Sequence, residues 1–165
     1  MGTNEIKIRV AREEEVERIA EIEAICFPEA EAAGLADFKE RMKAFPENFL
    51  VAVDGETIIG FINGCNTDKP VLGDELYHNA TLHKPDGEIQ TVFGLDVLPQ
   101  YQHRGIGHQL MRAYIEHART HGKKAVILTC KEQKITFYES LGYKKQGIAD
   151  SEHGGAVWYD MQQWF

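Results

Sequence analysis

The chain has few cysteines, no long apolar run and too few basic residues to balance its acids, and each shortage excludes a class of protein. Its three cysteines, Cys26, Cys65 and Cys130, lie far apart. They give neither a disulfide framework nor the close pairs that zinc sites use, so we expect reduced thiols and no metal. The first ten residues lack the apolar core, about 7–15 residues long, of a signal peptide, and no apolar run reaches the roughly 20 residues of a membrane span. We therefore expect a cytoplasmic protein that does not use a membrane.

The charge balance argues against a general nucleic-acid binder. Lys and Arg number 18 against 26 Asp and Glu, which gives a formal net charge of −8. Binding to phosphate backbones needs a basic surface that this composition does not supply. An acidic chain is better suited to a cationic small molecule. With 165 residues and 43% hydrophobic content, residues 1–165 are expected to form one domain around its own core.

Apolar periodicity predicts an alternation of strands and helices. Strands are expected at 6–10, 48–53, 57–64, 88–98, 124–130, 143–148 and 156–161, and helices at 12–27, 34–45, 105–121 and 133–141. This order predicts an α/β (α+β) fold with a single mixed, mostly antiparallel central sheet of about seven strands, flanked by about four helices. Residues 66–87 are expected to form a loop longer than most connections, which is typical of functional or disordered segments.

A glycine-containing turn between the expected strand 88–98 and helix 105–121 is the most informative segment. Its sequence from Gln102 to Gly107 is QHRGIG. A helix that begins at such a turn leaves unpaired backbone N–H groups at the positive end of its dipole, and these bind phosphate oxygens. Neither the dinucleotide fingerprint GxGxxG nor the GxxxxGK[ST] loop of nucleoside triphosphatases is present at this turn. The turn therefore predicts a phosphorylated cofactor of another kind.

Two motifs together resemble a known family. The pattern Q-x-x-G-x-G is similar to the acetyl-CoA signature of the GNAT superfamily of N-acetyltransferases. The segment 137–143, FYESLGY, is similar to the FY-x-x-x-GF signature of the same superfamily. The predicted order of elements also matches, so the resemblance covers nearly the whole chain. Within the superfamily, residues 126–130 (VILTC) and 82–85 (LHKP) resemble the arylalkylamine, or serotonin, N-acetyltransferase branch.

The resemblance implies how acetyl-CoA would bind. Backbone N–H groups from His103 to His108 would hold the CoA pyrophosphate, and the pantetheine arm would pair with the strand at Leu95 and Val97. The residues implied in cofactor binding are Leu95, Asp96, Val97, Gln102, His103, Arg104, Gly105, Ile106, Gly107, His108 and Tyr138. Glycine lets phosphate approach the backbone closely, although a plain tight turn would also favour glycine. Arg104 is expected either to contact phosphate or to be a solvated surface arginine.

The resemblance also implies a catalytic acid but leaves the base open. Tyr138 stands at the signature tyrosine, and its hydroxyl, which an ordinary pKa of about 10 keeps protonated at neutral pH, could return a proton to the departing thiolate when held close to sulfur. It could instead be a packed aromatic beside Phe137. In related enzymes the base occupies the positions of Thr91 and Phe93, and neither of these residues can act as one. We take His83 as the candidate base because of its intrinsic pKa. The other candidates are water alone, His78, Glu29, Glu31, Glu88 and Gln90.

The acceptor is expected to be a small primary amine. In this fold the acceptor pocket is usually built from the first two helices, the loop before the fourth strand and the last strands. Aromatic rings and carboxylates in those segments suit the cation of an aryl- or alkylamine. These residues are Phe27, Glu29, Glu31, Phe38, Tyr77, His78, Trp158 and Tyr159, and half or more of the aromatic ones are expected to be core.

We therefore predict an acetyl-CoA-dependent N-acetyltransferase in which the amine attacks the thioester directly. Two alternatives stay open. One is acetylation of a protein or peptide amine. The other is a CoA-binding regulatory module without catalysis, which the absence of a strand glutamate at Thr91 and Phe93 favours. Homodimers are common in the superfamily, but the sequence does not fix the oligomeric state.

Overall fold

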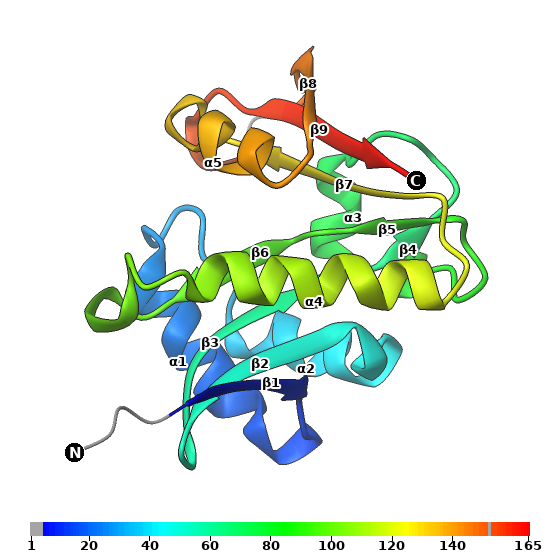
Figure 1. The fold of residues 1–165 in the computed structure, drawn as a ribbon. Coiled ribbons are helices and arrows are strands. Elements are labelled where there is room, and N and C mark those ends of the chain that lie inside the picture. Colours follow the sequence, from blue (N-terminus) through cyan, green and yellow to red (C-terminus); the bar gives the residue numbers. More distant parts are fainter. Residues whose placement is uncertain (1–4, 152) are drawn as a thin grey trace.

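A computed structural model describes residues 5–151 and 153–165, and Figure 1 shows how their helices and strands are arranged. The strands are β1 (Ile6–Val10), β2 (Phe49–Asp54), β3 (Thr57–Asn63), β4 (Asn66–Thr67), β5 (Ile89–Thr91), β6 (Gly94–Val97), β7 (Ala125–Cys130), β8 (Lys144–Ile148) and β9 (Tyr159–Trp164). The α-helices are α1 (Val16–Cys26), α2 (Leu35–Ala44), α3 (Asp74–His78), α4 (Ile106–Thr120) and α5 (Ile135–Ser140). The predicted α+β class, with mixed pairing of strands, is confirmed.

The strands form two sheets, where periodicity predicts one. The first sheet has the order β1-β2-β3-β6 and is antiparallel throughout. The second has the order β4-β5-β7-β9-β8, and its β5–β7 pair is parallel while its other pairs are antiparallel. The expected central sheet is thus divided. The chain passes between its two parts from β3 to β4, from β5 to β6 and, through α4, from β6 to β7.

A change of hydrogen-bond partner within the expected strand 88–98 causes this division. The Val92 N–H donates to the carbonyl of Ile127 in β7, with an N–O distance of 2.9 Å. One residue later, the Phe93 N–H donates to the carbonyl of Asn63 in β3, at 2.7 Å. β5 therefore belongs to one sheet and β6 to the other, and β6 is separated from β7 beyond this point. A sequence pattern cannot report this change, because it depends on which partner each half of the strand meets.

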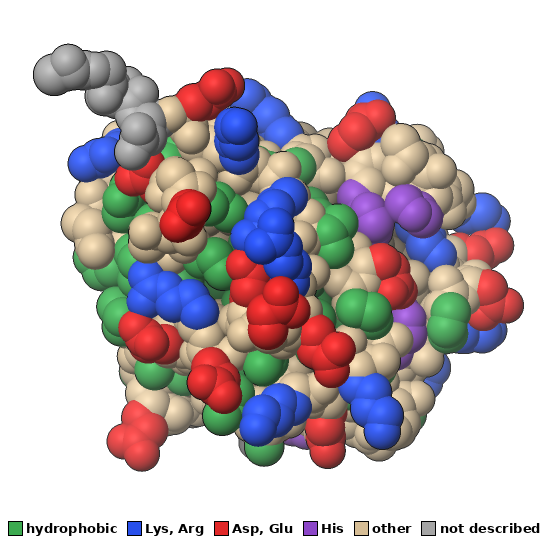
Figure 2. Space-filling view, turned by 90° about the horizontal axis from the view of Figure 1, so that it is seen from below, with side chains coloured by type: hydrophobic (Ala, Val, Ile, Leu, Met, Phe, Trp, Pro, Cys, Tyr) green, Lys and Arg blue, Asp and Glu red, His purple; other side chains and the backbone are tan. Residues whose placement is uncertain are grey.

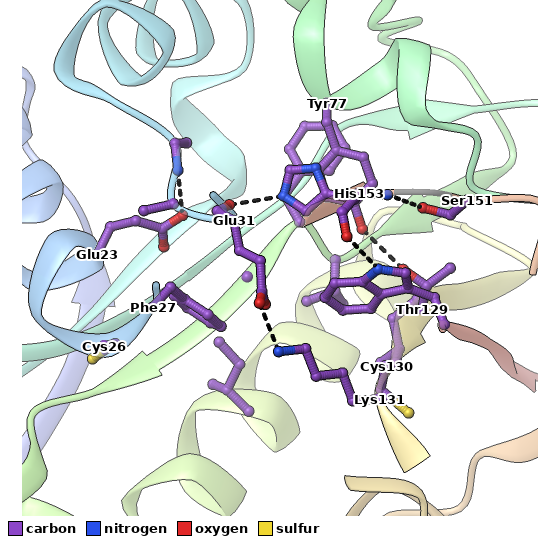
Figure 3. Close-up of a pocket in the computed structure, with 18 of the residues that line it drawn as sticks. Glu23, Cys26, Phe27, Glu31, Tyr77, Thr129, Cys130, Lys131, Ser151 and His153 are labelled. Carbon is purple, nitrogen blue, oxygen red and sulfur yellow. Dashed lines mark hydrogen bonds and ion pairs between the residues drawn. The ribbon is translucent and has the colours of Figure 1, made fainter. Parts of the chain in front are cut away.

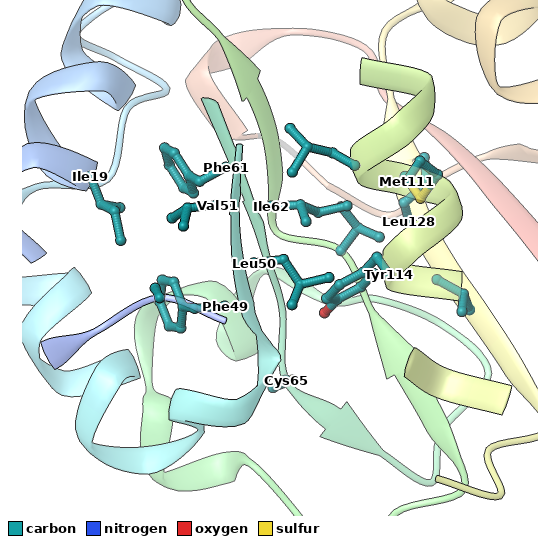
Figure 4. Close-up of a cluster of buried hydrophobic side chains, with 14 of the residues drawn as sticks. Ile19, Phe49, Leu50, Val51, Phe61, Ile62, Cys65, Met111, Tyr114 and Leu128 are labelled. Carbon is teal, nitrogen blue, oxygen red and sulfur yellow. The ribbon is translucent and has the colours of Figure 1, made fainter. Parts of the chain in front are cut away.

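Alternate side chains of the β2–β3 hairpin pack on opposite faces of the first sheet (Figure 4). Phe49, Val51 and Phe61 point toward α1 and α2, whereas Leu50 and Ile62 point toward α4. All five side chains belong to residues that are at most 6% exposed. Because successive strand residues point to opposite faces, helices must cover both sides of a sheet of this composition. Because both faces of the hairpin are covered, nearly all residues of β2 and β3 are buried.

Two further helices, α4 and α5, pack against the sheets. The apolar side of α4 is buried at Leu110, Met111, Tyr114 and Ala118, with the spacing that the sequence predicts. α5 lies against the second sheet, beside β8 and β9 (Figure 1). Residues 66–87, expected to be a loop, contain β4 and α3.

The surface carries charges of both signs. On the face seen in Figure 2, acidic and basic side chains are interspersed, and the basic ones form no continuous field there. Among the described residues, none of the helices has the length and apolar character needed to cross a bilayer.

Candidate active site

A cavity of about 300 Å³ opens where β6 and β7 diverge (Figure 3). Its walls come from the end of α1, from α2 and α3, from β6 and β7, and from α5. The aromatic side chains that line it are Phe27, Tyr77, Phe93, Tyr138 and Trp158. The charged ones include Glu23, Glu31, Asp37, Arg41 and Lys131. Apolar walls with a few convergent polar groups are typical of small-molecule sites.

The turn before α4 carries a row of free backbone donors. In the described chain, none of the N–H groups from His103 to His108 donates to another protein group, and the Gln109 N–H is the first to bond, to the carbonyl of Gly105 at 3.1 Å. His103 and Gly105 both have positive φ, 64° and 79°. Left-handed residues in such turns make concave groups of N–H donors. The row stands at the positive end of a 15-residue helix and can therefore hold an anion.

Side chains fix this turn against its neighbours. The Gln102 amide Nε2 donates to the carbonyl of Val97 at 2.9 Å, which ties the turn to the end of β6. The Arg104 guanidinium lies over the ring of Tyr101, 5.2 Å from its centre. Arg104 itself is exposed, so its charge is free to approach an anion at the turn.

The first turn of α4 also packs on α5. A Cβ added to Gly107 would lie 3.4 Å from Cζ of Phe137 and 3.9 Å from Cδ2 of Leu95. The His108 ring stands 4.7 Å from the ring of Phe137. A methyl group at position 107 would thus stand at ordinary van der Waals distance from α5 and β6, so the glycine chiefly leaves the backbone N–H accessible.

One edge of β6 is open toward the cavity. Asp96 pairs with Phe61 of β3, and the Leu98 N–H also bonds to β3. In an antiparallel ladder the intervening residues point the other way, so the backbone groups of Leu95 and Val97 face the open edge. The N–H and carbonyl of Leu95 and the N–H of Val97 can pair with an extended ligand, as a further strand would, whereas the Val97 carbonyl already accepts from Gln102 Nε2 and Cys26 Sγ. The same register turns the backbone groups of Asp96 away from that edge.

Tyr138 on α5 contributes a phenol to the cavity. Its hydroxyl makes no hydrogen bond with any other described residue. Burial raises the pKa of Tyr138 above its ordinary value, and nearby Cys130, Tyr77 and Asp96 raise it further. The phenol therefore stays protonated at neutral pH and has a proton to donate.

An ion pair crosses the cavity. Nζ of Lys131, which follows β7, lies 2.7 Å from Oε2 of Glu31, which follows α1 (Figure 3). Lys131 also lies 5.7 Å from the centre of the Trp158 ring, and Nε2 of His153 is 2.8 Å from the carbonyl oxygen of Glu31. These contacts link the segment between α1 and α2 to the C-terminal part of the chain, and they close one side of the cavity.

The comparison with protein families identifies the chain. A model described as the acetyltransferase (GNAT) family matches residues 16–143. The chain belongs to this family.

Individual relatives of this GNAT chain are distant. It is 25% identical over 129 residues to serotonin N-acetyltransferase of Mesocricetus auratus, an alignment that covers 78% of this chain and 61% of that protein. The chain thus spans about three fifths of the length of this relative. It is 24% identical over 165 residues to the N-alpha-acetyltransferase RimI of Mycobacterium tuberculosis, covering 98% and 94% of the two chains. Among solved structures, the GNAT-like decarboxylase GphF in complex with isobutyryl-CoA superposes with a TM-score of 0.83 at 19% identity, over 96% of this chain and 98% of that one, which shows a common fold.

His83, the candidate base from the sequence, does not line the cavity. The side chain of His83 is 3% exposed, and its Nδ1 accepts a hydrogen bond from the Asn66 N–H at 3.0 Å. Its ring packs 5.0 Å from that of Phe45. Burial lowers the pKa of His83. This environment suits a neutral histidine that holds β4 and its flanking segment together.

Some of the other residues singled out from the sequence line the cavity, and others lie outside it. Thr91 is fully buried and donates its Oγ1 hydrogen to the carbonyl of Cys65 at 3.1 Å, whereas Phe93 lines the cavity beneath Arg41. Of the predicted acceptor residues, those that line the cavity are Phe27, Glu31, Tyr77, His78 and Trp158. Those that lie outside its lining are Glu29, Phe38 and Tyr159.

Sequence reasoning missed one group of buried charges beside the cavity. Glu23, Arg41 and Asp96 are 7%, 4% and 1% exposed. Oε2 of Glu23 accepts a hydrogen bond from the Ala33 N–H at 3.0 Å, and both Glu23 and Arg41 line the cavity. Burial raises the pKa of Asp96 well above its usual range, and Glu23 raises it further, while burial lowers that of Arg41. Asp96 is conspicuous in the sequence as a lone carboxylate in an apolar strand, but Glu23 is one of many glutamates in an acidic helix.

Proposed function

We propose that this GNAT protein transfers the acetyl group of acetyl-CoA to a small primary aryl- or alkylamine, by direct attack of the amine on the thioester. One observation carries the proposal. A single cavity joins the open edge of β6, the unpaired hydroxyl of Tyr138 and several carboxylates, and the helix whose first turn carries the free N–H groups packs at Gly107 near Leu95 of the cavity lining. These are the parts that a thioester, its phosphates and a cationic acceptor require.

The CoA portion has two sets of partners in this proposal. The N–H groups from His103 to His108 bind the pyrophosphate, and the exposed Arg104 adds a charge-assisted contact. The pantetheine arm pairs with the backbone of Leu95 and Val97 along the open edge of β6. The complex of GphF with isobutyryl-CoA supports this assignment, since that protein has the same fold and binds an acyl-CoA.

Tyr138 is the proposed acid. When the tetrahedral intermediate collapses, the bond between the acyl carbon and sulfur breaks and its electron pair stays on sulfur. The phenol of Tyr138 then gives its proton to the thiolate. The pKa of Tyr138 is raised by burial, so the hydroxyl is fully protonated at neutral pH and can offer its proton to the sulfur as the C–S bond breaks. A backbone N–H of β6 can stabilise the oxyanion of the intermediate.

The dimensions of the cavity support a small acceptor. Its volume of about 300 Å³ is near the lower end for ligand sites, and the ion pair between Glu31 and Lys131 crosses it. A peptide acceptor requires an open groove, and this pair would have to part to admit one. The likeness to RimI supports a peptide acceptor as the alternative, because that relative is named an N-alpha-acetyltransferase.

The experiment measures thiol release from acetyl-CoA with two panels of acceptors, one of aryl- and alkylamines and one of peptides with free N-termini. We expect turnover with the amines and at least tenfold lower kcat/KM with the peptides. Turnover confined to peptides would contradict the proposed acceptor. Calorimetric binding of acetyl-CoA without turnover on either panel would favour the non-catalytic module, and no binding at all would contradict the cofactor assignment.

A further inference from the structure

The carboxyl groups of Glu23 and Asp96 converge at the cavity wall. Oε1 of Glu23 and both carboxyl oxygens of Asp96 are buried and have no hydrogen-bond partner among the described residues. A Cβ placed on Gly94 would lie 3.1 Å from Oδ1 of Asp96 and 3.6 Å from Oε1 of Glu23. Because Gly94 itself lines the cavity and carries no side chain, an acceptor amine can approach the two carboxyls at this point.

Few charges are available to balance two carboxylates here. The titratable groups that face Glu23 and Asp96 are Cys26 on α1, Arg41 on α2 and Tyr138 on α5. Arg41 directs its hydrogen bonds elsewhere, from Nη1 to Oδ1 of Asn63 at 3.2 Å and from Nη2 to the carbonyl of Tyr77 at 3.1 Å.

One cation that is hydrogen-bonded to other groups does not neutralise two buried anions. Two carboxyls in such a place hold a proton between them, since the second ionisation is opposed by both burial and repulsion. The raised pKa of Asp96, caused first by burial and then by Glu23, agrees with the proton residing on Asp96. Glu23 is the member that lines the cavity, with its unpartnered Oε1 close to Gly94, so it is the carboxyl that an acceptor can reach.

Building on the proposed function, we propose that Glu23 is the catalytic base that takes the proton from the acceptor ammonium, and that protonated Asp96 is a positioning residue that holds the Glu23 carboxylate ready. The ammonium N–H bond breaks and its proton moves to Oε1 of Glu23. The freed lone pair on nitrogen attacks the acyl carbon, and the π electrons of the carbonyl move to its oxygen.

The protons balance over the cycle. After attack, the positively charged nitrogen of the intermediate loses a second proton to water, and the C–S bond breaks. Tyr138 protonates the departing thiolate and regains a proton from water. Glu23 finally releases its proton to solvent, so that each turnover gives one amide, one thiol and one free proton.

A purely structural role for Glu23 makes a different prediction. Its Oε2 accepts from the Ala33 N–H, and the amide oxygen of glutamine at this position can accept the same bond. Glu23→Gln therefore keeps the local structure and removes only the capacity to take a proton. The matched control is Glu21→Gln on the same helix, where the side chain is 62% exposed and pairs with Arg18.

The decisive measurement compares two acceptors. One is the best alkylamine of the panel, which is an ammonium ion at neutral pH, and the other is 2,2,2-trifluoroethylamine, which is uncharged there. Glu23→Gln is expected to lower kcat/KM about 100-fold or more for the ammonium and less than about fivefold for the uncharged amine, because only the first needs a base before attack. Binding of acetyl-CoA by calorimetry should be unchanged, and Glu21→Gln should behave as the unmodified protein. Equal losses for both amines, or no loss for either, would overturn the role of Glu23.

Two measurements test the carboxyl pair separately. Asp96→Asn is expected to move the acidic limb of the pH–rate profile to higher pH, because it removes the acid hydrogen that Asp96 shares with the Glu23 carboxylate and that makes this carboxylate harder to protonate. An infrared difference spectrum between the unmodified protein and Asp96→Asn should contain the carbonyl stretch of a protonated carboxylic acid at neutral pH. The absence of that band would contradict the proposal that Glu23 and Asp96 share a proton, even if the protein proved inactive. Inactivity of the unmodified protein on every amine would instead contradict the proposed function, and with it the role of Glu23.

Discussion

Lys131 and Glu31 join opposite walls of the cavity, with Nζ 2.7 Å from Oε2. The two residues are 100 positions apart in the sequence, and their side chains are 28% and 8% exposed. A carboxylate as buried as that of Glu31 is costly to leave without its partner. The pair therefore holds the segment after α1 against the end of β7 and limits what can enter.

Lys131→Met should open this side of the cavity while keeping an apolar stem over the Trp158 ring. The partnerless Glu31 carboxylate will turn toward solvent, and the segment after α1 will loosen. We expect kcat/KM for small amines to fall about tenfold, equivalent to about 1.4 kcal/mol, and the ratio of peptide to amine turnover to rise. The control is Lys124→Met, which breaks an exposed pair with Glu88 away from the cavity. Unchanged selectivity would show that the pair does not limit access.

Tyr138→Phe should lower kcat about 100-fold and leave the affinity for acetyl-CoA unchanged, because it removes the proton donor and keeps the ring. Stopped-flow thiol release and calorimetry on the same preparation provide the two numbers. Tyr159→Phe is the matched control, since its ring lies outside the cavity lining. If Tyr138→Phe turned over at the unmodified rate, water and not Tyr138 would be the donor of the proton to the departing thiolate.

Gly105→Ala should weaken acetyl-CoA binding by about tenfold. The residue has φ of 79°, where a side chain costs about 1–2 kcal/mol, and any relaxation of the turn misaligns the N–H groups. Gly55, in the β2–β3 turn, has φ of 64°, and like Gly105 it has no atom within 4 Å of an added Cβ. Gly55→Ala should therefore lower the melting temperature to a similar extent, by about 2–8 °C, without affecting acetyl-CoA binding. Equal binding by both variants would contradict the anion site.

The unfolding free energy should fall as the pH drops below about 6.5, partly through His83. Burial lowers the pKa of folded His83, so the unfolded chain binds its proton first. The stabilisation is therefore complete above the unfolded pKa and is lost as the pH falls through the folded one. In His83→Asn, whose amide oxygen can still accept from the Asn66 N–H, this part of the pH dependence should disappear. Denaturant titrations at several pH values measure it.

The same variant tests the sequence-based assignment of His83 as the base. With the imidazole buried outside the cavity lining, we expect His83→Asn to keep at least a third of the unmodified kcat/KM at pH 7.5. A drop of 100-fold with normal acetyl-CoA binding would restore His83 as the base and count against Glu23.

Most of the elements could be predicted from the sequence because their signals are local. The spacing of Leu110, Met111 and Tyr114 predicts α4, and Asp54-Gly55 predicts the β2–β3 turn. The strand 88–98 could not be predicted as two strands, since both halves are apolar and differ only in their hydrogen-bond partners. Residues 66–87 predict a loop for a different reason, since Pro and Gly residues interrupt any periodic pattern there, although the segment contains β4 and α3.

The sequence by itself determined the family, most of the order of elements and the glycine turn before α4, because each depends on neighbouring residues whose spacing is visible along the chain. The tertiary structure decided which side chains share the cavity. It turned His83 inward, joined Glu31 to Lys131, and brought Glu23 next to Asp96 from 73 positions away. Such pairs depend on the divergence of β6 from β7 and on the packing of α1 beside it, and no local pattern in the sequence records either distance.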